Sequence, residues 1–251
     1  MEIDLAFSPE EVERKDLQGK AVVVIDVLRA TSTMIVAFEN GCAAFIPVGT
    51  IEEARNLVAQ KKSPDFLLGG ERGAIPVEGF HCGNSPRDYV RGRVKGKTVV
   101  LTTTNGTRAL VASRKGAEIF VGAFLNLAAL IQRLVESGRD VLIACSGEKG
   151  FFCLDDTVCG GAMVARLEEN GIAIRPRESA QAARILYDRY ARDIPGLLRS
   201  CEWGQQLERM GWGEDIPICA QLDSSDLVPV FKGGRIFLDR SRSEEAKNRI
   251  D

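Results

Sequence analysis

Short apolar runs alternate with longer amphipathic stretches along most of this chain. The apolar runs are rich in β-branched residues, as is typical of strands buried on both faces of a sheet. They predict strands at residues 21–26, 43–48, 66–68, 98–103, 119–121 and 141–145. The stretches between them have helical spacing and predict helices at residues 31–40, 51–60, 105–115, 125–137 and 156–170. This alternation predicts an α/β fold with three layers, α/β/α, and a mostly parallel sheet.

Two segments of the chain resemble each other. Gly19 opens GKAVVVIDVLRATSTMIVAFENGCAAFIPVG, and Gly96 opens GKTVVLTTTNGTRALVASRKGAEIFVGA. Each segment reads as a strand, a polar loop, a helix, a glycine and a second strand. A third segment, from Gly138, repeats the strand, the loop and the helix. We therefore expect repeated β-loop-α units, with three polar loops at the carboxyl ends of parallel strands, where open α/β sheets bind ligands.

The pattern changes after Gly171. Helices are predicted at residues 178–192 and, in one or two pieces, at 197–210, and two short strands at 227–239 are separated by Gly233-Gly234. The tail, residues 241–251, is expected to be a frayed and solvated end. Because no Pro-rich or Ser-rich linker marks a boundary, we expect a single domain over residues 1–251, and a subdomain division near residue 171 stays open.

Composition narrows the functional classes. The chain has 251 residues, of which 45% are hydrophobic and 27% charged, and 33 Lys and Arg nearly balance 35 Asp and Glu. A formal net charge of -2 gives no broad positive field for nucleic acid or an anionic membrane, so a local cluster must bind any anionic ligand. The seven scattered Cys residues contain no CxxC pair, which favours reduced thiols over disulfides or zinc.

The beginning of the chain and its hydropathy predict the cellular compartment of the protein. Its N-terminus is acidic and lacks the order of a signal peptide, and no apolar run approaches ~18 residues. We therefore expect a cytoplasmic protein, with no membrane or nucleic-acid partner, and a homodimer stays open.

The loop after the first predicted strand combines Asp26, Arg29 and Thr31. A carboxylate at the end of a buried strand loses hydration and needs a cation, a metal or hydrogen-bond donors nearby. The free N–H groups of the helix that follows could face an anion. A structural pair of Asp26 with Arg29, beside an ordinary helix cap, is the alternative.

The second loop is denser in hydroxyl groups than helix capping requires. Its polar side chains could surround a phosphate: Thr103, Thr104, Asn105 and Thr107. The Walker pattern is absent, which disfavours an ATP-binding P-loop. A strand that is merely rich in β-branched Thr is the alternative.

Two further segments could add ligands. Between the first two loops, Glu71 offers a hard oxygen ligand and Arg72 a forked donor, beside glycines that allow close backbone approach. The third loop ends in Asp155-Asp156, whose carboxylates would repel Asp26 unless a divalent cation lay between them. Carboxylates with few His residues favour Mg²⁺ over zinc. The alternatives are a solvated ion pair for the first segment and helix-start residues favoured by the dipole for the second.

His81-Cys82 suggests a thiolate phosphatase, but the pattern does not fit. Arg87 follows Cys82 after four residues where that class needs five, and no Ser or Thr follows this Arg. We therefore expect Cys82 to be a buried or spectator thiol. His81 is the only histidine, and nothing near it reads as a nucleophile elbow.

Taken in order, seven segments resemble the 2-phosphosulfolactate phosphatase family: VVVIDVLRATSTM, LLGGERG, GFHCGNSP, LTTTNGTRAL, GAFLNLAA, LDDTVCGGA and CAQLDSSDLVP. They run from about residue 20 to about residue 230. The resemblance implies a magnesium-dependent hydrolase that converts 2-phospho-3-sulfolactate, and related 2-hydroxy acid phosphates, to the hydroxy acid and inorganic phosphate. In methanogens that step belongs to coenzyme M biosynthesis.

Two positions depart from the family pattern. His81-Cys82 stands where the family usually has Asp-Leu, and Asp155 stands where Glu is common. The second change keeps a carboxylate with a shorter reach, whereas the first replaces a carboxylate by an imidazole. His81 therefore receives no family role.

Together, residues and resemblance predict a site with three kinds of groups. Asp26 and Arg29 are the expected catalytic residues. The expected Mg²⁺ ligands are carboxylates: Asp26, Glu71, Asp155 and Asp156. The substrate is expected to contact Thr31, Arg72, Asn84, Thr103, Thr104, Asn105 and Thr107, with Arg29, Arg72 and Asn84 recognising its acid groups. A phosphate-ligand sensor without catalysis, and a phosphatase or mutase for another small phosphate ester, remain as alternatives.

Overall fold

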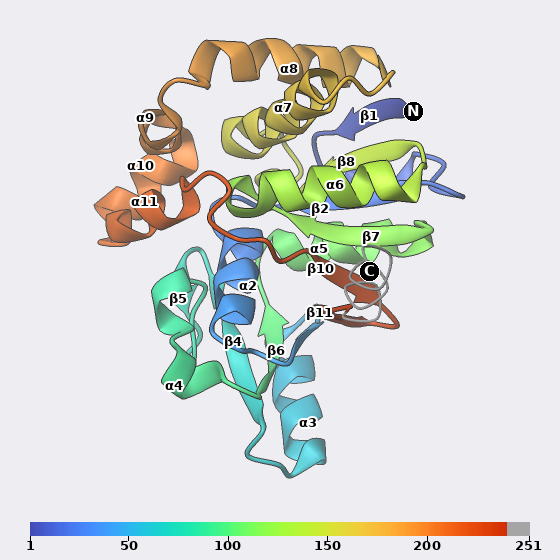
Figure 1. Ribbon diagram of the computed structural model, residues 1–251. Coiled ribbons are helices and arrows are strands. Elements are labelled where there is room, and N and C mark those ends of the chain that lie inside the picture. The colour runs from blue at the N-terminus through green and yellow to red at the C-terminus, as the bar shows by residue number, and fades with distance from the viewer. Residues whose placement is uncertain (240–251) are drawn as a thin grey trace, which may run out of the picture.

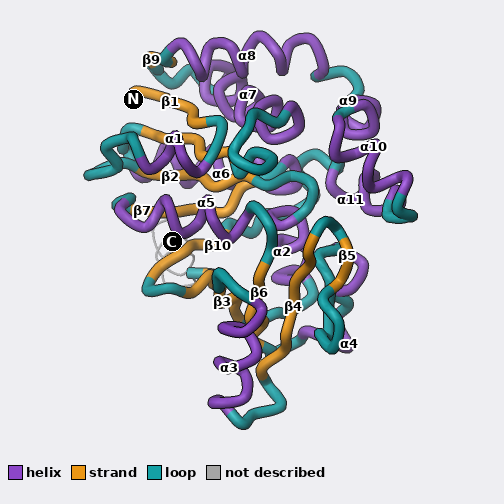
Figure 2. Tube along the Cα trace, turned by 180° about the vertical axis from the view of Figure 1, so that it is seen from behind, coloured by secondary structure: helices purple, strands orange, loops and turns teal. Residues whose placement is uncertain are grey.

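The computed structural model describes residues 1–239 and contains one large sheet between layers of helices (Figures 1 and 2). The sheet has 11 strands in the order β5-β4-β6-β3-β11-β10-β7-β2-β8-β1-β9. The strands are β1 (Glu2–Ala6), β2 (Ala21–Ile25), β3 (Ala44–Pro47), β4 (Phe66–Arg72), β5 (Ile75–Pro76), β6 (Thr98–Thr102), β7 (Glu118–Gly122), β8 (Val141–Cys145), β9 (Arg175–Pro176), β10 (Pro229–Lys232) and β11 (Arg235–Leu238). The predicted three-layer α/β/α fold with a mostly parallel sheet is confirmed.

An antiparallel hairpin divides this sheet into two parallel halves. Strands β4, β6 and β3 pair in parallel on one side, and β7, β2, β8 and β1 do so on the other. Hairpin β10–β11 lies between them and pairs antiparallel with both β7 and β3. Strands β3 and β7 therefore point in opposite directions. In Figure 1, β2 runs across the view while β6 runs up it.

Helices cover both faces of the sheet. The α-helices are α1 (Pro9–Glu13), α2 (Ala30–Glu39), α3 (Ile51–Lys61), α4 (Arg91–Val94), α5 (Gly106–Ala112), α6 (Leu127–Ser137), α7 (Leu154–Glu169), α8 (Glu178–Tyr190), α9 (Ile194–Ser200), α10 (Glu202–Arg209) and α11 (Ile216–Cys219). Short 3₁₀ turns are η1 (Pro86–Asp88), η2 (Ser113–Lys115), η3 (Phe124–Asn126) and η4 (Gly213–Asp215). Around β2, helices α6 and α7 lie on one face, whereas α1 and α5 lie on the other (Figures 1 and 2).

The alternation of side chains along β2 explains this arrangement. Val23 and Ile25 join the apolar cluster under α6 and α7, while Val22 and Val24 join the cluster under α2 and α5. Because successive side chains of a strand point to opposite faces, a run of apolar residues needs cover on both sides. The run AVVVI is buried throughout as a result.

The two repeated segments both form a strand, a loop, a helix and a second strand, as predicted. Each segment also crosses between the halves of the sheet, because β2 and β7 pair in one half and β6 and β3 pair in the other. The first strand of each segment thus pairs with the last strand of the other. That the repeats superpose in detail stays a prediction.

Other expectations differ at particular elements. The helix expected at 105–115 is an α-helix that continues as a 3₁₀ turn, and the region 197–210 forms two helices. Strands β1, β5 and β9 and helices α1, α4 and α11 were not predicted. The tail at 241–251 lies outside the described residues. Helix α8 packs on α7 and adds Ala180 and Ala183 to the main apolar cluster, while the subdomain division near residue 171 stays a prediction.

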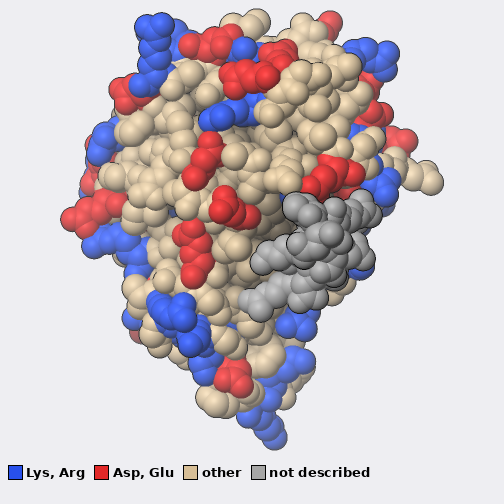
Figure 3. All heavy atoms as spheres, in the orientation of Figure 1, with Lys and Arg blue, Asp and Glu red and all other residues tan. Residues whose placement is uncertain are grey.

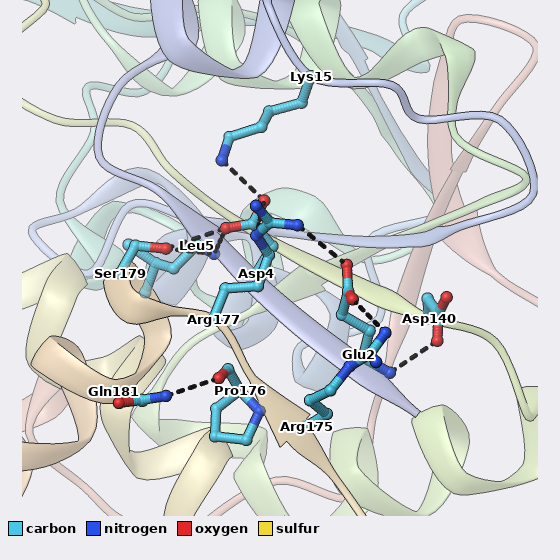
Figure 4. A network of polar contacts seen from close by, with 10 residues as sticks. All are labelled: Glu2, Asp4, Leu5, Lys15, Asp140, Arg175, Pro176, Arg177, Ser179 and Gln181. Atoms are coloured by element: carbon cyan, nitrogen blue, oxygen red, sulfur yellow. Dashed lines mark hydrogen bonds and ion pairs between the residues drawn. The ribbon is translucent and has the colours of Figure 1, made fainter.

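Strand β1 contains a buried carboxylate, Asp4, within a network of polar contacts (Figure 4). Asp4 Oδ2 lies 2.7 Å from Lys15 Nζ, and Oδ1 accepts hydrogen bonds from Ser179 Oγ and the Leu5 N–H, both at 2.9 Å. Burial acts to raise the pKa of Asp4, but the hydrogen bonds from Lys15 and Ser179 outweigh it, so the pKa lies below its ordinary value. The network thereby joins β1 to α8.

Charged side chains of both signs are interspersed over the face shown in Figure 3, and Lys and Arg predominate at its lower end, around α3 and α4. This distribution agrees with the formal net charge of -2. Among residues 1–239, no helix is long and apolar enough to cross a membrane.

Candidate active site

The predicted loops meet where the two repeated segments face each other. Gly106, at the start of α5, lies so close to the first loop that a Cβ there would stand 2.6 Å from Asp26 Oδ2 and 2.8 Å from Ala30 Cβ. Only glycine permits this approach, because a Cβ would overlap both atoms. The carboxyl ends of β2 and β6 therefore converge, although the two strands belong to different halves of the sheet.

Asp26 is a nearly buried carboxylate with few protein donors. Its Oδ1 accepts a hydrogen bond from the Ala30 N–H at 3.0 Å, and its backbone is held by the Thr31 hydroxyl. Burial raises the pKa of Asp26 to about 7, and the carboxylates of Asp155, Glu71 and Glu148 add to the increase. At neutral pH this group is poised between its charged and neutral forms. The Thr31 hydroxyl therefore stabilises the backbone of the first loop at Asp26.

Asp155 and Asp156, at the start of α7, have different surroundings. Asp156 accepts hydrogen bonds from three backbone N–H groups, of Val27 (2.8 Å), Ser146 (3.1 Å) and Gly147 (3.2 Å). Burial raises the pKa of Asp156 well above its ordinary value, and the Asp155 and Asp26 carboxylates raise it further. Burial also raises the pKa of Asp155, whose hydrogen bonds come only from its own turn.

Asp156 therefore ties the first loop to the third, whereas Asp155 keeps a less engaged carboxylate. Cys153 lies beside them: its Sγ and carboxylate oxygens of Asp155 and Asp156 lie within 4.8 Å of one another. The sequence did not single out Cys153. Burial raises the pKa of its thiol well above the ordinary value, so the sulfur is neutral.

Glu71 and Arg72 reach this region from the end of β4. Glu71 accepts hydrogen bonds from the backbone N–H groups of Ala74 and Thr104, each at 2.8 Å, and from the Thr104 hydroxyl at 3.1 Å. The Arg72 guanidinium donates to the carbonyls of Glu71 (2.7 Å) and Thr102 (3.3 Å) and to the Thr102 hydroxyl (2.9 Å). In the described part of the chain Arg72 makes no ion pair, so its charge stays uncompensated.

The hydroxyls of the second loop are partly used within the loop. The Thr107 hydroxyl donates to the Thr103 carbonyl at 3.0 Å, and Thr103 Oγ1 accepts from the Thr107 N–H at 3.2 Å. Asn105 Nδ2 donates to Glu148 Oε2 at 2.7 Å, which links the second loop to the third. Glu148 is a residue that the sequence did not indicate, because nothing distinguishes it from other acidic loop residues.

Arg29 is almost fully buried and pairs with a residue from the far end of the chain. Its Nη1 lies 2.7 Å from Oδ2 of Asp215, Nη2 donates to the Ala74 carbonyl at 3.3 Å, and the Trp212 ring lies 5.3 Å from the guanidinium carbon. The structural alternative predicted a pair of Arg29 with Asp26. This prediction is wrong, because Arg29 pairs with Asp215. Among the described residues, the Nε of Arg29 has no hydrogen-bond partner.

The segment after β5 contributes one buried site candidate. Asn84 is buried, and its carbonyl accepts from the Thr33 hydroxyl at 2.8 Å, whereas its side-chain Oδ1 has no hydrogen-bond partner within residues 1–239. His81 is exposed, and its Nδ1 accepts from the Leu68 N–H at 2.9 Å. Burial raises the pKa of the Cys82 thiol to about 11, so this sulfur is protonated at neutral pH.

The donor set fits a hard divalent cation. Within residues 1–239, none of the carboxylates Asp26, Glu71, Asp155 and Asp156 makes an ion pair, although all are buried. Buried carboxylates that lack a cation are unfavourable when ionised, and oxygen ligands are those that Mg²⁺ prefers. A cavity of about 560 Å³ lies elsewhere, beside Arg133 and Lys232, and none of the predicted site residues lines it.

Comparison with known proteins agrees with these features. The family described as 2-phosphosulpholactate phosphatase matches residues 6–234. A protein of Symbiobacterium thermophilum is 38% identical over 224 residues, covering 89% of this chain and 96% of the relative. A protein of Clostridium acetobutylicum is 36% identical over 237 residues, covering 94% of this chain and 100% of the relative. Both are described as probable 2-phosphosulfolactate phosphatases.

Proposed function

Because the chain belongs to the 2-phosphosulpholactate phosphatase family, we propose that it is a magnesium-dependent phosphoric monoester hydrolase acting on 2-phospho-3-sulfolactate. Related 2-hydroxy acid phosphates would be substrates too, and the products would be the hydroxy acid and inorganic phosphate. The observation that carries the proposal is the group of buried carboxylates around Asp26, whose charge no cation offsets within residues 1–239.

Asp26 and Asp155 are the residues that would hold Mg²⁺. Both are buried. Asp26 accepts one backbone N–H, and the hydrogen bonds of Asp155 come from its own turn, whereas Asp156 and Glu71 accept backbone N–H groups from other loops. A bound Mg²⁺ supplies positive charge that offsets the phosphoryl oxygens in the transition state. Asp156 and Glu71 would then position the three loops around the metal ligands.

Arg72 is the cation best suited to the phosphate. Its partners are carbonyls and a hydroxyl, which orient the guanidinium without neutralising it. Guanidinium groups bind phosphate through paired, charge-assisted hydrogen bonds. Thr104 and Asn105, beside Arg72 and Glu148, would complete the phosphate contacts, and Thr103 and Thr107 would hold the loop in shape.

Asp26 would also move a proton or form a bond during the reaction. Burial raises the pKa of Asp26 to about 7 in the metal-free protein; a bound Mg²⁺ would lower it, and the ionised carboxylate would then accept a proton from the attacking water. The alternative is direct attack by Asp26 on phosphorus, which would break the ester P–O bond, release the hydroxy acid with a proton taken from water, and leave an aspartyl-phosphate that water would hydrolyse to inorganic phosphate and free Asp26. Acid quenching during turnover followed by mass spectrometry of the Asp26 peptide distinguishes the two routes.

The test is phosphate release by chelator-treated protein from 2-phospho-3-sulfolactate, 2-phospholactate and glycerol 2-phosphate, each with and without Mg²⁺. We expect phosphate release only with Mg²⁺. We also expect kcat/KM to be roughly 100-fold higher for the acid esters, because an ester without acid groups leaves unpaired the protein donors that would bind those groups. Arg72→Ala should reduce turnover of all three esters. Arg55→Ala, which removes an exposed guanidinium bonded to the Glu78 carbonyl, is the matched control.

Each other outcome points to one of the alternatives. Binding of the ester without phosphate release would indicate a sensor. Equal rates on acid and neutral esters would refute recognition of the acid groups. Magnesium-independent release would contradict the metal role of the carboxylates.

A further inference from the structure

The C-terminal part of the chain closes one end of the candidate site through a single buried carboxylate. Asp215, in η4, is fully buried and bridges two loops: Oδ2 lies 2.7 Å from Arg29 Nη1, and Oδ1 accepts from Ser85 Oγ at 2.7 Å. Arg29 precedes α2, and Ser85 caps η1. One side chain therefore fixes the spacing of two segments that are far apart in sequence.

Next to this bridge, two buried polar atoms have no hydrogen-bond partner in the part of the chain that the structure describes. They are Nε of Arg29 and Oδ1 of Asn84, the residue before Ser85. Leaving a buried donor or acceptor unsatisfied costs about 1–3 kcal/mol, so such atoms are rare unless a ligand or water meets them. Their occurrence on the two segments that Asp215 joins indicates a place for a polar ligand group.

A continuous chain of contacts links this place to the phosphate end of the site. The Ala74 carbonyl accepts from Arg29 Nη2, and the Ala74 N–H donates to Glu71 Oε2. Glu71 Oε1 in turn accepts from the Thr104 N–H. A small substrate with a phosphate near Thr104 could thus extend an acid group toward Arg29.

We propose that Asp215 is a positioning residue that holds Arg29 and the Asn84-Ser85 segment as a subsite for an acid group of the substrate. Trp212 supports it, because its ring lies 5.3 Å from the guanidinium carbon and limits the movement of Arg29. The inference rests on the proposed hydrolysis of 2-phospho acids and adds a specificity determinant from the C-terminal segment. The free Nε–H of Arg29 is the donor, and the Asn84 amide can turn to present its NH₂ group.

The experiment compares Asp215→Asn with the matched control Asp223→Asn. Asp223 lies in the same C-terminal segment and pairs with Arg166 at 3.0 Å, but Arg166 belongs to α7, away from this subsite. For Asp215→Asn we expect KM for 2-phospho-3-sulfolactate to rise roughly 10- to 100-fold, with kcat/KM for glycerol 2-phosphate within about threefold of wild type. Asp223→Asn should change neither quantity.

Binding of sulfolactate, followed by calorimetry, gives a readout that needs no turnover and should weaken in parallel. Equal losses on acid and neutral esters, or unchanged sulfolactate binding, would overturn the positioning role. Wild-type protein that releases no phosphate from any ester would instead refute the proposed function.

Asp215→Asn leaves Arg29 buried without its anion, which could prevent folding. Trp212→Leu is the second variant, because it removes the ring over Arg29 while both charges stay. We expect a smaller loss of the same selectivity, with cooperative thermal unfolding retained. A folded Trp212→Leu protein with wild-type selectivity and wild-type sulfolactate binding would also overturn the proposal.

Discussion

Two buried carboxylates, Asp4 and Asp26, lie in or directly after the strands on either side of β8 and have opposite electrostatic surroundings. Asp4 lies in β1, and Asp26 follows β2. Asp4 meets Lys15, Ser179 and the Leu5 N–H, and its pKa lies below the ordinary value despite burial. Asp26 meets one backbone N–H and three other carboxylates, and burial raises its pKa to about 7.

The difference separates a structural carboxylate from a candidate functional one. A buried carboxyl that has its cation and donors in the fold has a lowered pKa, so its ionisation favours the folded state, and it leaves little capacity for a ligand. A buried carboxyl without them destabilises the ionised fold and favours binding of a cation. The exposed fraction alone would not distinguish Asp4 from Asp26, because both are buried.

The largest expected effect is on activity. Asp26→Asn removes a charge at nearly constant volume, so we expect kcat/KM to fall by roughly 1,000-fold or more while cooperative unfolding is retained. Phosphate release with saturating Mg²⁺ measures it. Asp4→Asn is the control and should keep activity near that of the wild type. Near-normal turnover by Asp26→Asn would remove the distinction between the two carboxylates.

The second effect concerns the pH dependence of stability. In metal-free protein, folded Asp26 keeps its proton up to about pH 7, whereas the unfolded chain loses it near its ordinary value of 3.8. Raising the pH between these values therefore favours unfolding, by a few kcal/mol at most, and Mg²⁺ should oppose the loss. Thermal unfolding from pH 4 to pH 8, with Mg²⁺ or with chelator, measures this. Asp26→Asn should make the metal-free profile less steep, although the raised pKa values of Asp155 and Asp156 keep part of the slope; an unchanged profile would contradict the assignment.

For Asp4 we expect the free energy of unfolding to change with pH in the opposite direction. Its pKa is lowered, so the stability it provides is complete above about pH 3.8 and is lost as the pH falls through the folded pKa. Asp4→Asn should lower the free energy of unfolding at neutral pH by about 1–3 kcal/mol. Asp65→Asn, which breaks an exposed pair with Lys97, should cost clearly less than Asp4→Asn, because water screens this pair. Chemical denaturation of the three proteins tests whether the two costs differ.

The smallest expected effect tests whether burial by itself marks a functional group. Burial raises the pKa of Cys82 to about 11, and the charged groups of residues 1–239 that act on its thiol are Arg93 and Asp88, not the carboxylates expected to bind metal. Cys82→Ser should therefore keep at least about half of the wild-type kcat/KM. Complete loss of turnover, with phosphate trapped on the wild-type cysteine, would show that the thiol is the nucleophile.

Periodicity predicted the central strands and the helices beside them, because continuous apolar runs such as AVVVI have few other stable placements. It missed β1, where Asp4 interrupts the apolar pattern. The partners that make Asp4 compatible with burial, Lys15 and Ser179, lie 11 and 175 residues away. Local patterns also gave no indication that β10–β11 separates the two parallel halves.

The candidate site could be predicted only where its residues follow strands. Asp26 and Thr103 come directly after β2 and β6, and the carboxyl ends of strands are where ligands bind in such folds. The sequence did not indicate Asp215, because it lies 186 residues from Arg29, the residue with which it pairs. Arg29 itself was expected to offer a free charge, and sequence alone could not reveal that a distant carboxylate compensates it.

Hairpin β10–β11 follows every other strand in chain order, yet it lies in the middle of the sheet. During synthesis on the ribosome, β3 and β7 therefore emerge long before the strands that pair with their open edges. Unpaired strand edges are the places where nascent chains pair wrongly with one another. Strands β10 and β11, which are synthesised after the others described, thus join the two halves of the sheet. A chain that ends before residue 229 would lack them, and the edges of β3 and β7 in the centre of the sheet would be unpaired.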